Sequence, residues 1–215
     1  ICPDLPGCGK SPLSHSQNTL EEIAIQLEDW MEENLIKDPI LIGHSLGGYV
    51  MLALLELMGK KLKAVGLFHS TAFADDEEKK GMRNRTIIFL KKHGVDKFVT
   101  SFVPPLIPED KRDEFQAEID IAIAQAKQST LDGLIAYTKA MRDRKDRFEV
   151  LKNFSGSKLL IAGTEDGAVK IDASRKHKEA ITDYFELENT GHLGMIERKE
   201  ESLKIVREFC ERVIE

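Results

Sequence analysis

A serine flanked by glycines is the residue of this sequence best suited to act as a nucleophile. The segment Gly43-His44-Ser45-Leu46-Gly47 follows an apolar run of strand length, residues 39–43, and precedes a helical pattern over residues 47–58. A serine held in a sharp turn between a strand and a helix exposes its hydroxyl, and glycines beside it let the backbone segments approach closely. The alternative interpretation is an ordinary glycine-rich turn in which the serine caps the helix.

A serine hydroxyl is a poor nucleophile at neutral pH, so a reactive Ser45 requires a base and a carboxylate that orients the base. Asp166 follows a predicted strand over residues 158–162, and His192 lies in a loop after a predicted strand over residues 183–187. Because open α/β sheets place their ligands at the carboxyl ends of the strands, we expect Ser45, Asp166 and His192 to meet there. Their order along the chain is the order expected of this strand-turn-helix arrangement.

Other residues compete for the roles of acid and base. The carboxylates that compete with the predicted acid are Glu165, Asp172, Asp75 and Asp76. The competing interpretation of His192 is a structural histidine in a loop.

Four more side chains are candidates for the substrate pocket. His44 adjoins Ser45, but a sharp turn should point its side chain away from the hydroxyl, so packing beneath the turn is favoured over catalysis. His69 ends a predicted strand on the same side, where it either lines the pocket or forms a polar strand end. Phe98 and Phe102 either roof an apolar pocket or form the core of a helical segment.

Two further histidines and the three cysteines give no site. His93 and His177 lie among lysines, so we expect both to be solvated. Cys2, Cys8 and Cys210 are an odd number without a C-x-x-C pair, which predicts neither a disulfide framework nor a thiolate metal site. We therefore expect a reducing compartment, with a cytoplasmic location as the default.

Composition limits the classes of protein to which the chain can belong. Its 215 residues correspond to roughly one to two average domains, and 41% are hydrophobic, which is enough for one sizeable core. A formal net charge of -6 provides no broad cationic face for nucleic acid or an anionic membrane. No apolar run reaches the length of about 18 residues that spans a bilayer. We expect a small-molecule partner, and the sequence leaves the oligomeric state open.

Strand and helix patterns alternate along most of the chain. Residues 18–34 carry apolar side chains at helical spacing, and Thr19 with Glu22 predicts a capping box. Short apolar runs predict strands, helical segments separate them, and the last helix carries an apolar stripe from Leu203 to Val213. This alternation predicts an α/β fold with a mainly parallel sheet and helices on both faces.

One stretch interrupts the alternation. From about residue 75 to 147 there is no convincing strand, whereas helical stripes recur and prolines at 104, 105 and 108 punctuate them. The sequence therefore predicts a core built from residues 1–72 and 151–215, with a helical insertion over residues 73–150.

Taken together, these motifs resemble the α/β-hydrolase superfamily over almost the whole chain. The segment from Asp4 to Ser11, DLPGCGKS, matches the family's D-x-x-G-x-G-x-S loop before the nucleophile turn. The turn itself, the segment Gly163-Thr164-Glu165-Asp166, and Gly191-His192 followed by Glu197 occur in the family order. The resemblance implies that the insertion is a cap over the active site and that residues 142–147 lead from the cap back to the sheet.

The sequence departs from the family pattern at its beginning. Family members carry an H-G loop upstream of the D-x-x-G-x-G-x-S segment, and that loop supplies one oxyanion donor. Here the backbone N–H of Leu46 is the donor that can be assigned, and the second donor is absent from this chain. We expect the first strands of the family fold to be missing with that loop, so that this sequence is a fragment of a longer chain.

The resulting hypothesis is a serine hydrolase that cleaves an ester-type acyl bond of a small molecule without a cofactor or metal. A serine at the turn, where epoxide hydrolases and dehalogenases carry an aspartate, argues against those branches. Thioester, lactone and carbon–carbon hydrolysis and acyl transfer stay open, because they share the three catalytic residues. The alternative from another class is a non-catalytic member that binds a ligand in the same cleft.

Overall fold

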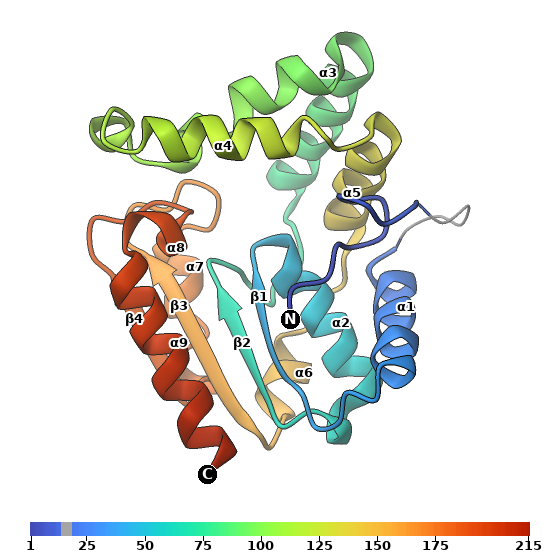
Figure 1. Cartoon of the computed structure of the whole chain (residues 1–215), viewed down its shortest axis with the longest axis vertical. Coiled ribbons are helices and arrows are strands. Elements are labelled where there is room, and N and C mark those ends of the chain that lie inside the picture. Colours follow the sequence, from blue (N-terminus) through green and yellow to red (C-terminus); the bar gives the residue numbers. More distant parts are fainter. Residues whose placement is uncertain (14–18) are drawn as a thin grey trace.

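The sheet is parallel, as the alternating pattern predicts. A computed structural model describes residues 1–13 and 19–215, and within these residues four strands pair in the order β1-β2-β3-β4 (Figure 1). The strands are β1 (Ile40–His44), β2 (Ala64–Phe68), β3 (Ser157–Gly163) and β4 (Asp183–Leu187). All four carboxyl ends therefore lie at one edge of the sheet.

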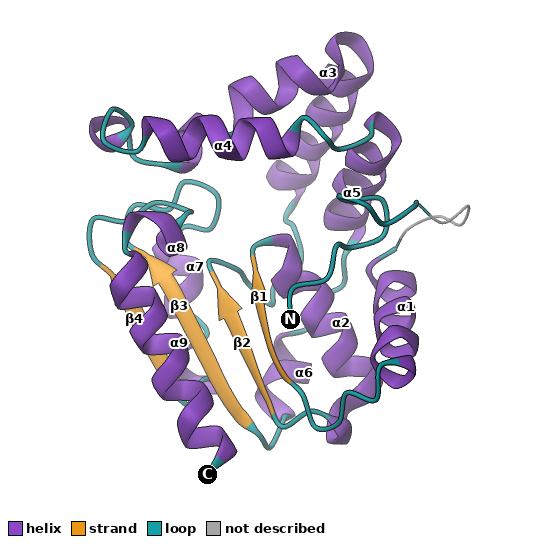
Figure 2. Cartoon of the chain, in the orientation of Figure 1, coloured by secondary structure: helices purple, strands orange, loops and turns teal. Residues whose placement is uncertain are grey.

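Helices cover both faces of this sheet (Figure 2). Alternate side chains of β2 point to opposite faces: Val65 and Leu67 pack with the helices α1 and α2, whereas Ala64 and Phe68 pack with α9. Every residue of β2 is buried, as expected of a strand covered on both sides. The covering helices are α1 (Leu20–Glu33), α2 (Leu46–Met58), α6 (Phe148–Asn153), α7 (Ile171–Arg175), α8 (Gly194–Glu197) and α9 (Lys199–Ile214).

The capping box predicted at the first helix is present. The Glu22 N–H donates to the Thr19 hydroxyl at 3.1 Å, and the Thr19 N–H donates to the Glu22 carboxylate at 2.9 Å. These two bonds satisfy backbone donors that the start of a helix otherwise leaves unpaired.

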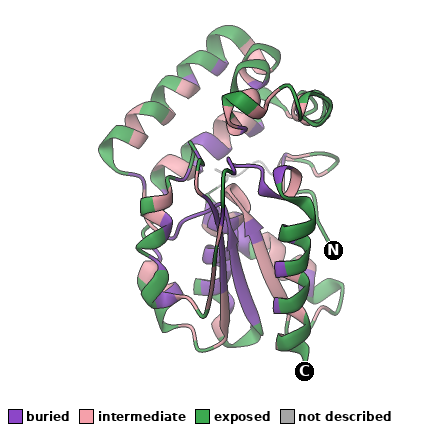
Figure 3. Cartoon of the chain, turned by 90° about the vertical axis from the view of Figure 1, so that its left-hand side faces the viewer, coloured by how far each residue is buried: buried purple, intermediate pink, exposed green. Residues whose placement is uncertain are grey.

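The predicted helical insertion lies between β2 and β3 along the chain and over the carboxyl edge of the sheet (Figures 1 and 3). We call residues 77–143 the helical insertion. Its elements are α3 (Glu77–Phe102), the 3-10 turns Pro104–Leu106 and Glu109–Lys111, α4 (Gln116–Ala126) and α5 (Leu131–Asp143). The helix α6, whose first residues fall in the predicted insertion, instead contacts α2 in the core. Two further 3-10 turns are Gly59–Lys61 and Lys178–Ala180.

In the described residues, none of the helices combines the length and the apolar character that crossing a membrane requires.

Candidate active site

Ser45 sits in a strained turn between β1 and α2. Its backbone angles are φ 49° and ψ −116°, a left-handed conformation that residues with a side chain rarely adopt. Two bonds hold the turn in place: the Ser45 N–H donates to the Phe68 carbonyl at 3.0 Å, and the Ser70 hydroxyl donates to the Ser45 carbonyl at 2.7 Å. The strain is therefore maintained by the neighbouring strand β2 and the residues that follow it.

The turn needs glycine where the backbone crosses itself. A Cβ at Gly43 would lie 2.3 Å from the Gly47 carbonyl oxygen, so a larger residue cannot fit without moving the backbone. Within the described chain, the Ser45 side chain makes no capping bond to α2, which contradicts the interpretation of a simple capping serine. Leu46 begins α2, and its N–H is one of the donors that a helix start leaves without an intrahelical partner.

The predicted acid and base meet at the carboxyl edge. The His192 Nδ1 lies 2.8 Å from the Asp166 Oδ2, and both side chains are buried. The competing carboxylates lie elsewhere: Asp75 forms an ion pair with Arg144, and the Asp76 side chain caps α3. Glu165 and Asp172 are exposed, whereas Asp166 is buried, and neither has a bond to His192 among the described contacts.

The Asp166 carboxylate is held in its charged form. Burial alone would raise its pKa, but hydrogen bonds from His192 and His69 outweigh burial and lower the pKa below its usual range. Its other oxygen accepts the N–H groups of Ala168 and Val169 at 2.8 and 2.9 Å. A permanently charged carboxylate facing Nδ1 favours the tautomer in which the Nε2 of His192 is free to accept a proton.

His44 links the nucleophile turn to the base. Its Nε2 lies 2.8 Å from the backbone carbonyl oxygen of His192, so the imidazole must be the donor in this bond. Burial lowers the pKa of His44 to about 4, which keeps the ring neutral at pH 7. The side chain lies against the Phe68 and His192 rings, and its bond ties the residue before Ser45 to His192.

His69 occupies a different place from the pocket wall considered in the sequence analysis. Its side chain is 1% exposed, and its Nδ1 lies 3.2 Å from the Asp166 Oδ2. Burial lowers the pKa of His69, and the same Nδ1 also accepts the Gly163 N–H at 3.2 Å. The adjacent strands β2 and β3 end at the same edge, which brings His69 to Asp166. The sequence placed His69 at this edge but carried no signal for its contact with Asp166.

Glu197 has a role that the sequence did not indicate, although it belongs to the motif after His192. Its carboxylate is buried and accepts the N–H groups of Gly191 at 2.9 Å and Leu193 at 3.1 Å. These two residues flank His192, so Glu197 fixes the backbone on both sides of the base.

A scan against protein-family models matches residues 1–203 to the alpha/beta hydrolase family. This chain belongs to the alpha/beta hydrolase family. The comparison with curated proteins finds no matching relative.

Solved structures show the same fold at low sequence identity. A malate-bound thermophilic esterase from Thermogutta terrifontis superimposes with a TM-score of 0.90 at 23% identity, covering 98% of this chain and 78% of that one. The enol-lactonase from Burkholderia xenovorans LB400 superimposes with a TM-score of 0.86 at 20% identity, covering 97% of this chain and 79% of that one. A bromoperoxidase from Bacillus anthracis superimposes with a TM-score of 0.80 at 16% identity, covering 95% of this chain and 80% of that one. At these identities the likeness establishes the α/β-hydrolase fold alone.

In this hydrolase, the aromatic candidates lie on the helical insertion. Phe98 stacks on Phe102 with ring centroids 5.1 Å apart and packs against the apolar cluster of the insertion. Phe102 is 47% exposed. A pocket role for these two side chains stays a prediction.

The expectation that His177 is solvated is wrong. Its side chain is fully buried, Nε2 accepts the Ala72 N–H at 2.9 Å, and Nδ1 lies 2.9 Å from the Ala173 carbonyl oxygen. Neighbouring lysines misled the prediction, because the chain turns this one side chain inward against Phe73. His93 is exposed, as expected.

The fold also brings together three possible metal ligands that are far apart in the sequence. Ligand atoms of His69, Asp166 and His192 all lie within 4.8 Å of one another. Zn²⁺ binds nitrogen and oxygen ligands at about 2.0–2.2 Å and requires deprotonated ring nitrogens. Here both Nδ1 atoms lie at hydrogen-bond distance from one carboxylate oxygen, and this geometry fits a hydrogen-bonded network.

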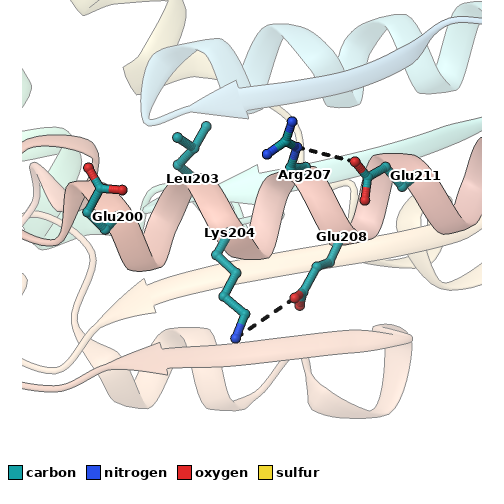
Figure 4. A pocket seen from close by; sticks show the side chains of 6 residues that line it. All are labelled: Glu200, Leu203, Lys204, Arg207, Glu208 and Glu211. Carbon is teal, nitrogen blue, oxygen red and sulfur yellow. Dashed lines mark ion pairs between the residues drawn. The ribbon is translucent and has the colours of Figure 1, made fainter.

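A surface depression on α9 contains none of these residues (Figure 4). Ion pairs join Arg207 to Glu211 at 3.2 Å and Lys204 to Glu208 at 3.9 Å along the helix. The depression is lined by Glu200, Leu203, Lys204, Arg207, Glu208 and Glu211.

Proposed function

We propose that this α/β-hydrolase cleaves a carboxylic ester of a small molecule through an acyl-enzyme on Ser45. The observation that carries the proposal is the buried pair of His192 and Asp166. A hydrogen bond joins this pair to His44, the residue before the strained Ser45. The arrangement supplies the three functions that activate a hydroxyl: a nucleophile in an exposed turn, a base, and a carboxylate that orients the base.

The reaction follows from these roles. Ser45 attacks the ester carbonyl carbon while His192 accepts the hydroxyl proton at Nε2. The imidazolium then donates this proton to the leaving alcohol, and the acyl group stays on the serine oxygen. Water, deprotonated by the same imidazole, attacks the acyl carbon and releases the carboxylic acid. Asp166 stabilises the imidazolium in both halves of the cycle.

Charge also develops on the carbonyl oxygen during each attack. The Leu46 N–H, at the start of α2, is our candidate donor to this oxygen, and the partial positive charge of the helix start supports the assignment. We propose further that the helical insertion closes over the site as a cap, since it lies above the carboxyl edge.

A fluorophosphonate probe tests the proposal, because it reacts with activated serines. We expect labelling of the wild-type chain and none of Ser45→Ala. Ser155→Ala serves as the matched control, since Ser155 is exposed in the loop before β3. A folded wild-type protein that resists the probe would instead indicate a member that binds a ligand without turnover.

Substrate class requires a second measurement. Nitrophenyl esters, thioesters and lactones of graded length share the same attack on a carbonyl carbon, so turnover across such a panel separates these bond types. The proposal predicts the highest kcat/KM for an ester.

A further inference from the structure

The loop that carries His192 is held at three consecutive backbone donors. The N–H groups of Gly191 and Leu193 donate to Glu197, which belongs to the core helix α8. The N–H of His192 itself donates to the Leu106 carbonyl at 2.7 Å, and Leu106 belongs to the helical insertion. The insertion therefore binds the base directly, midway between two bonds from the core.

Apolar packing joins the same two parts. Leu193, the residue after the base, is 9% exposed and packs in the insertion's own apolar cluster, which contains Val99, Val103, Ile107 and Ile119. The backbones also approach closely, because a Cβ at Gly191 would lie 2.5 Å from the Leu106 carbonyl oxygen. The side chain after His192 is thus part of the insertion's core, although its backbone follows β4.

One side chain braces the turn that presents the Leu106 carbonyl. The Nε of Arg112 donates to the carbonyl oxygens of Pro104 at 3.1 Å and Ile107 at 3.2 Å, on either side of Leu106. Nearby, the Lys111 ammonium donates to the Asn189 carbonyl in the loop that leads to the base. Prolines at 104 and 105 remove two backbone donors from this turn. The Pro104 carbonyl also accepts the Ile107 N–H at 3.1 Å, and the arginine adds a second donor to it.

We propose that the helical insertion positions the base, and that Arg112 is the positioning residue that keeps the Leu106 carbonyl on the N–H of His192. The inference rests on the proposed function of His192. It extends that function by making the base competent only while the turn over residues 104–108 is docked on the loop.

The physical reason lies in the burial of the contact. If the turn moves away, the N–H of His192 loses its acceptor and Leu193 loses its apolar surroundings, so the loop must rearrange to recover both. A rearrangement of the loop rotates the imidazole relative to Asp166 and to Ser45. A displacement of about 1 Å is enough to slow an enzyme by about 100-fold, because the reacting atoms must be aligned.

Two variants of the turn and one control test the proposal in the full chain. Arg112→Gln removes the brace, and Ile107→Ala removes a fully buried anchor of the turn. Ile87→Ala is the matched control, because Ile87 is a buried isoleucine of α3 outside the cluster that holds Leu193. We expect kcat to fall about tenfold or more in both turn variants while KM changes by less than about threefold. The control should stay within about twofold of wild type in both constants, and Arg112→Lys should recover part of kcat.

A second measurement does not depend on turnover. In protein with isotope-labelled histidine, the Nδ1 proton that His192 shares with Asp166 resonates at low field in the NMR spectrum. We expect Arg112→Gln to shift or broaden this signal and Ile87→Ala to leave it unchanged. Unchanged kcat and an unchanged signal in Arg112→Gln would overturn the inference, as would an equal loss of kcat in the control. If the wild type turns over no ester, the proposed function fails, and the NMR comparison alone still decides whether the turn positions the imidazole.

Discussion

The Asp166 carboxylate has four polar partners at hydrogen-bond distance, two on each oxygen. Two come from the imidazoles of His69 and His192, and two come from backbone N–H groups. Such partners stabilise a buried negative charge that burial alone would disfavour. The Asp166 carboxylate is thereby fixed in both charge and direction.

Asp166→Asn tests this role. An amide preserves the shape but removes the charge, and its NH₂ group cannot accept the His192 proton, so the imidazole takes the wrong tautomer. We expect kcat to fall by about 10⁴-fold with little change in fold, measured by ester turnover and circular dichroism. Glu165→Gln, an exposed neighbour, should retain kcat within about twofold. Near-normal turnover in Asp166→Asn would assign the acid to another carboxylate.

His177 gives a prediction for the pH dependence of stability. Burial lowers its pKa in the folded state, whereas the unfolded chain binds a proton below about pH 6.5. The unfolded state therefore binds more protons as the pH falls, and the free energy of unfolding decreases below about pH 6.5. His177→Gln removes this contribution. The difference in free energy of unfolding between wild type and variant, from urea titrations, should be smaller at pH 5 than at pH 7.5.

His93→Gln provides the comparison variant, because the His93 side chain is exposed whereas His177 is buried. A difference for His177→Gln that is equal at both pH values would mean that its imidazole titrates normally in the folded state.

Single residues of the site differ in how far the sequence could reveal them. Ser45, Asp166 and His192 follow from their order and their places after strands. The contact of His69 with Asp166 and the bonds of Glu197 to both neighbours of the base depend on tertiary packing. Residue type and spacing carry no signal for a bond that forms only when two strand ends or a helix and a loop come together.

At the scale of elements, the turn from β1 to α2 leaves little space between its backbone segments. β1 must end beside β2, and α2 must begin at once, so the backbone crosses itself at Gly43 and Gly47. The glycines at these positions are not equivalent. A Cβ at Gly43 meets backbone, whereas a Cβ at Gly47 meets nothing within 4 Å.

Substitution by alanine should separate these two glycines. Gly43→Ala forces the backbone apart and should lower the free energy of unfolding by about 1–3 kcal/mol or more, with loss of probe labelling at Ser45. Gly47→Ala should leave stability equal or higher by up to about 1 kcal/mol, because alanine favours the helix. Thermal or urea unfolding measures both. Equal stability of the two variants would contradict the close backbone approach at Gly43.

Sequence patterns located most elements because the apolar positions keep the period of each element. The first half of α3, which begins at Glu77, is the exception, because its apolar residues form no clear stripe. Much of this half is exposed, and its buried residues are Ile87 and Leu90. So few buried positions give the sequence only a weak helical repeat of apolar residues. The backbone also kinks at Gly94, where φ is 77°, and interrupts the period there.

For the whole molecule, the attachment of the helical insertion to the core depends on buried charge. Arg144, at the return to the core, pairs with Asp75 at 2.7 Å, and Asp75 lies at the start of the insertion. The same guanidinium lies 4.1 Å from the centroid of the Tyr49 ring, one turn along α2 from Ser45. The Arg144 side chain thus joins the segment that enters the insertion, the segment that leaves it, and the helix α2 that follows Ser45.

Arg144→Leu should destabilise the chain by about 1.5–3 kcal/mol, because the buried Asp75 carboxylate loses its nearest cation but keeps the Arg83 guanidinium at 3.1 Å. Arg142→Leu removes a more exposed pair with Asp143 and should change stability by less than about 1 kcal/mol. Urea unfolding of the two variants provides the measurement. Similar losses from both would show that Arg144 contributes no more than a surface ion pair.

The strand order has a consequence for the time at which the hydroxyl becomes reactive. His44 ends β1 and His192 follows β4, at opposite sides of the four-strand order, so their bond forms only after three parallel pairings between distant segments have formed. Pairings between residues far apart in sequence form slowly. During synthesis and refolding the serine should therefore stay inert until the last strand has joined, and the appearance of probe labelling should coincide with the end of folding.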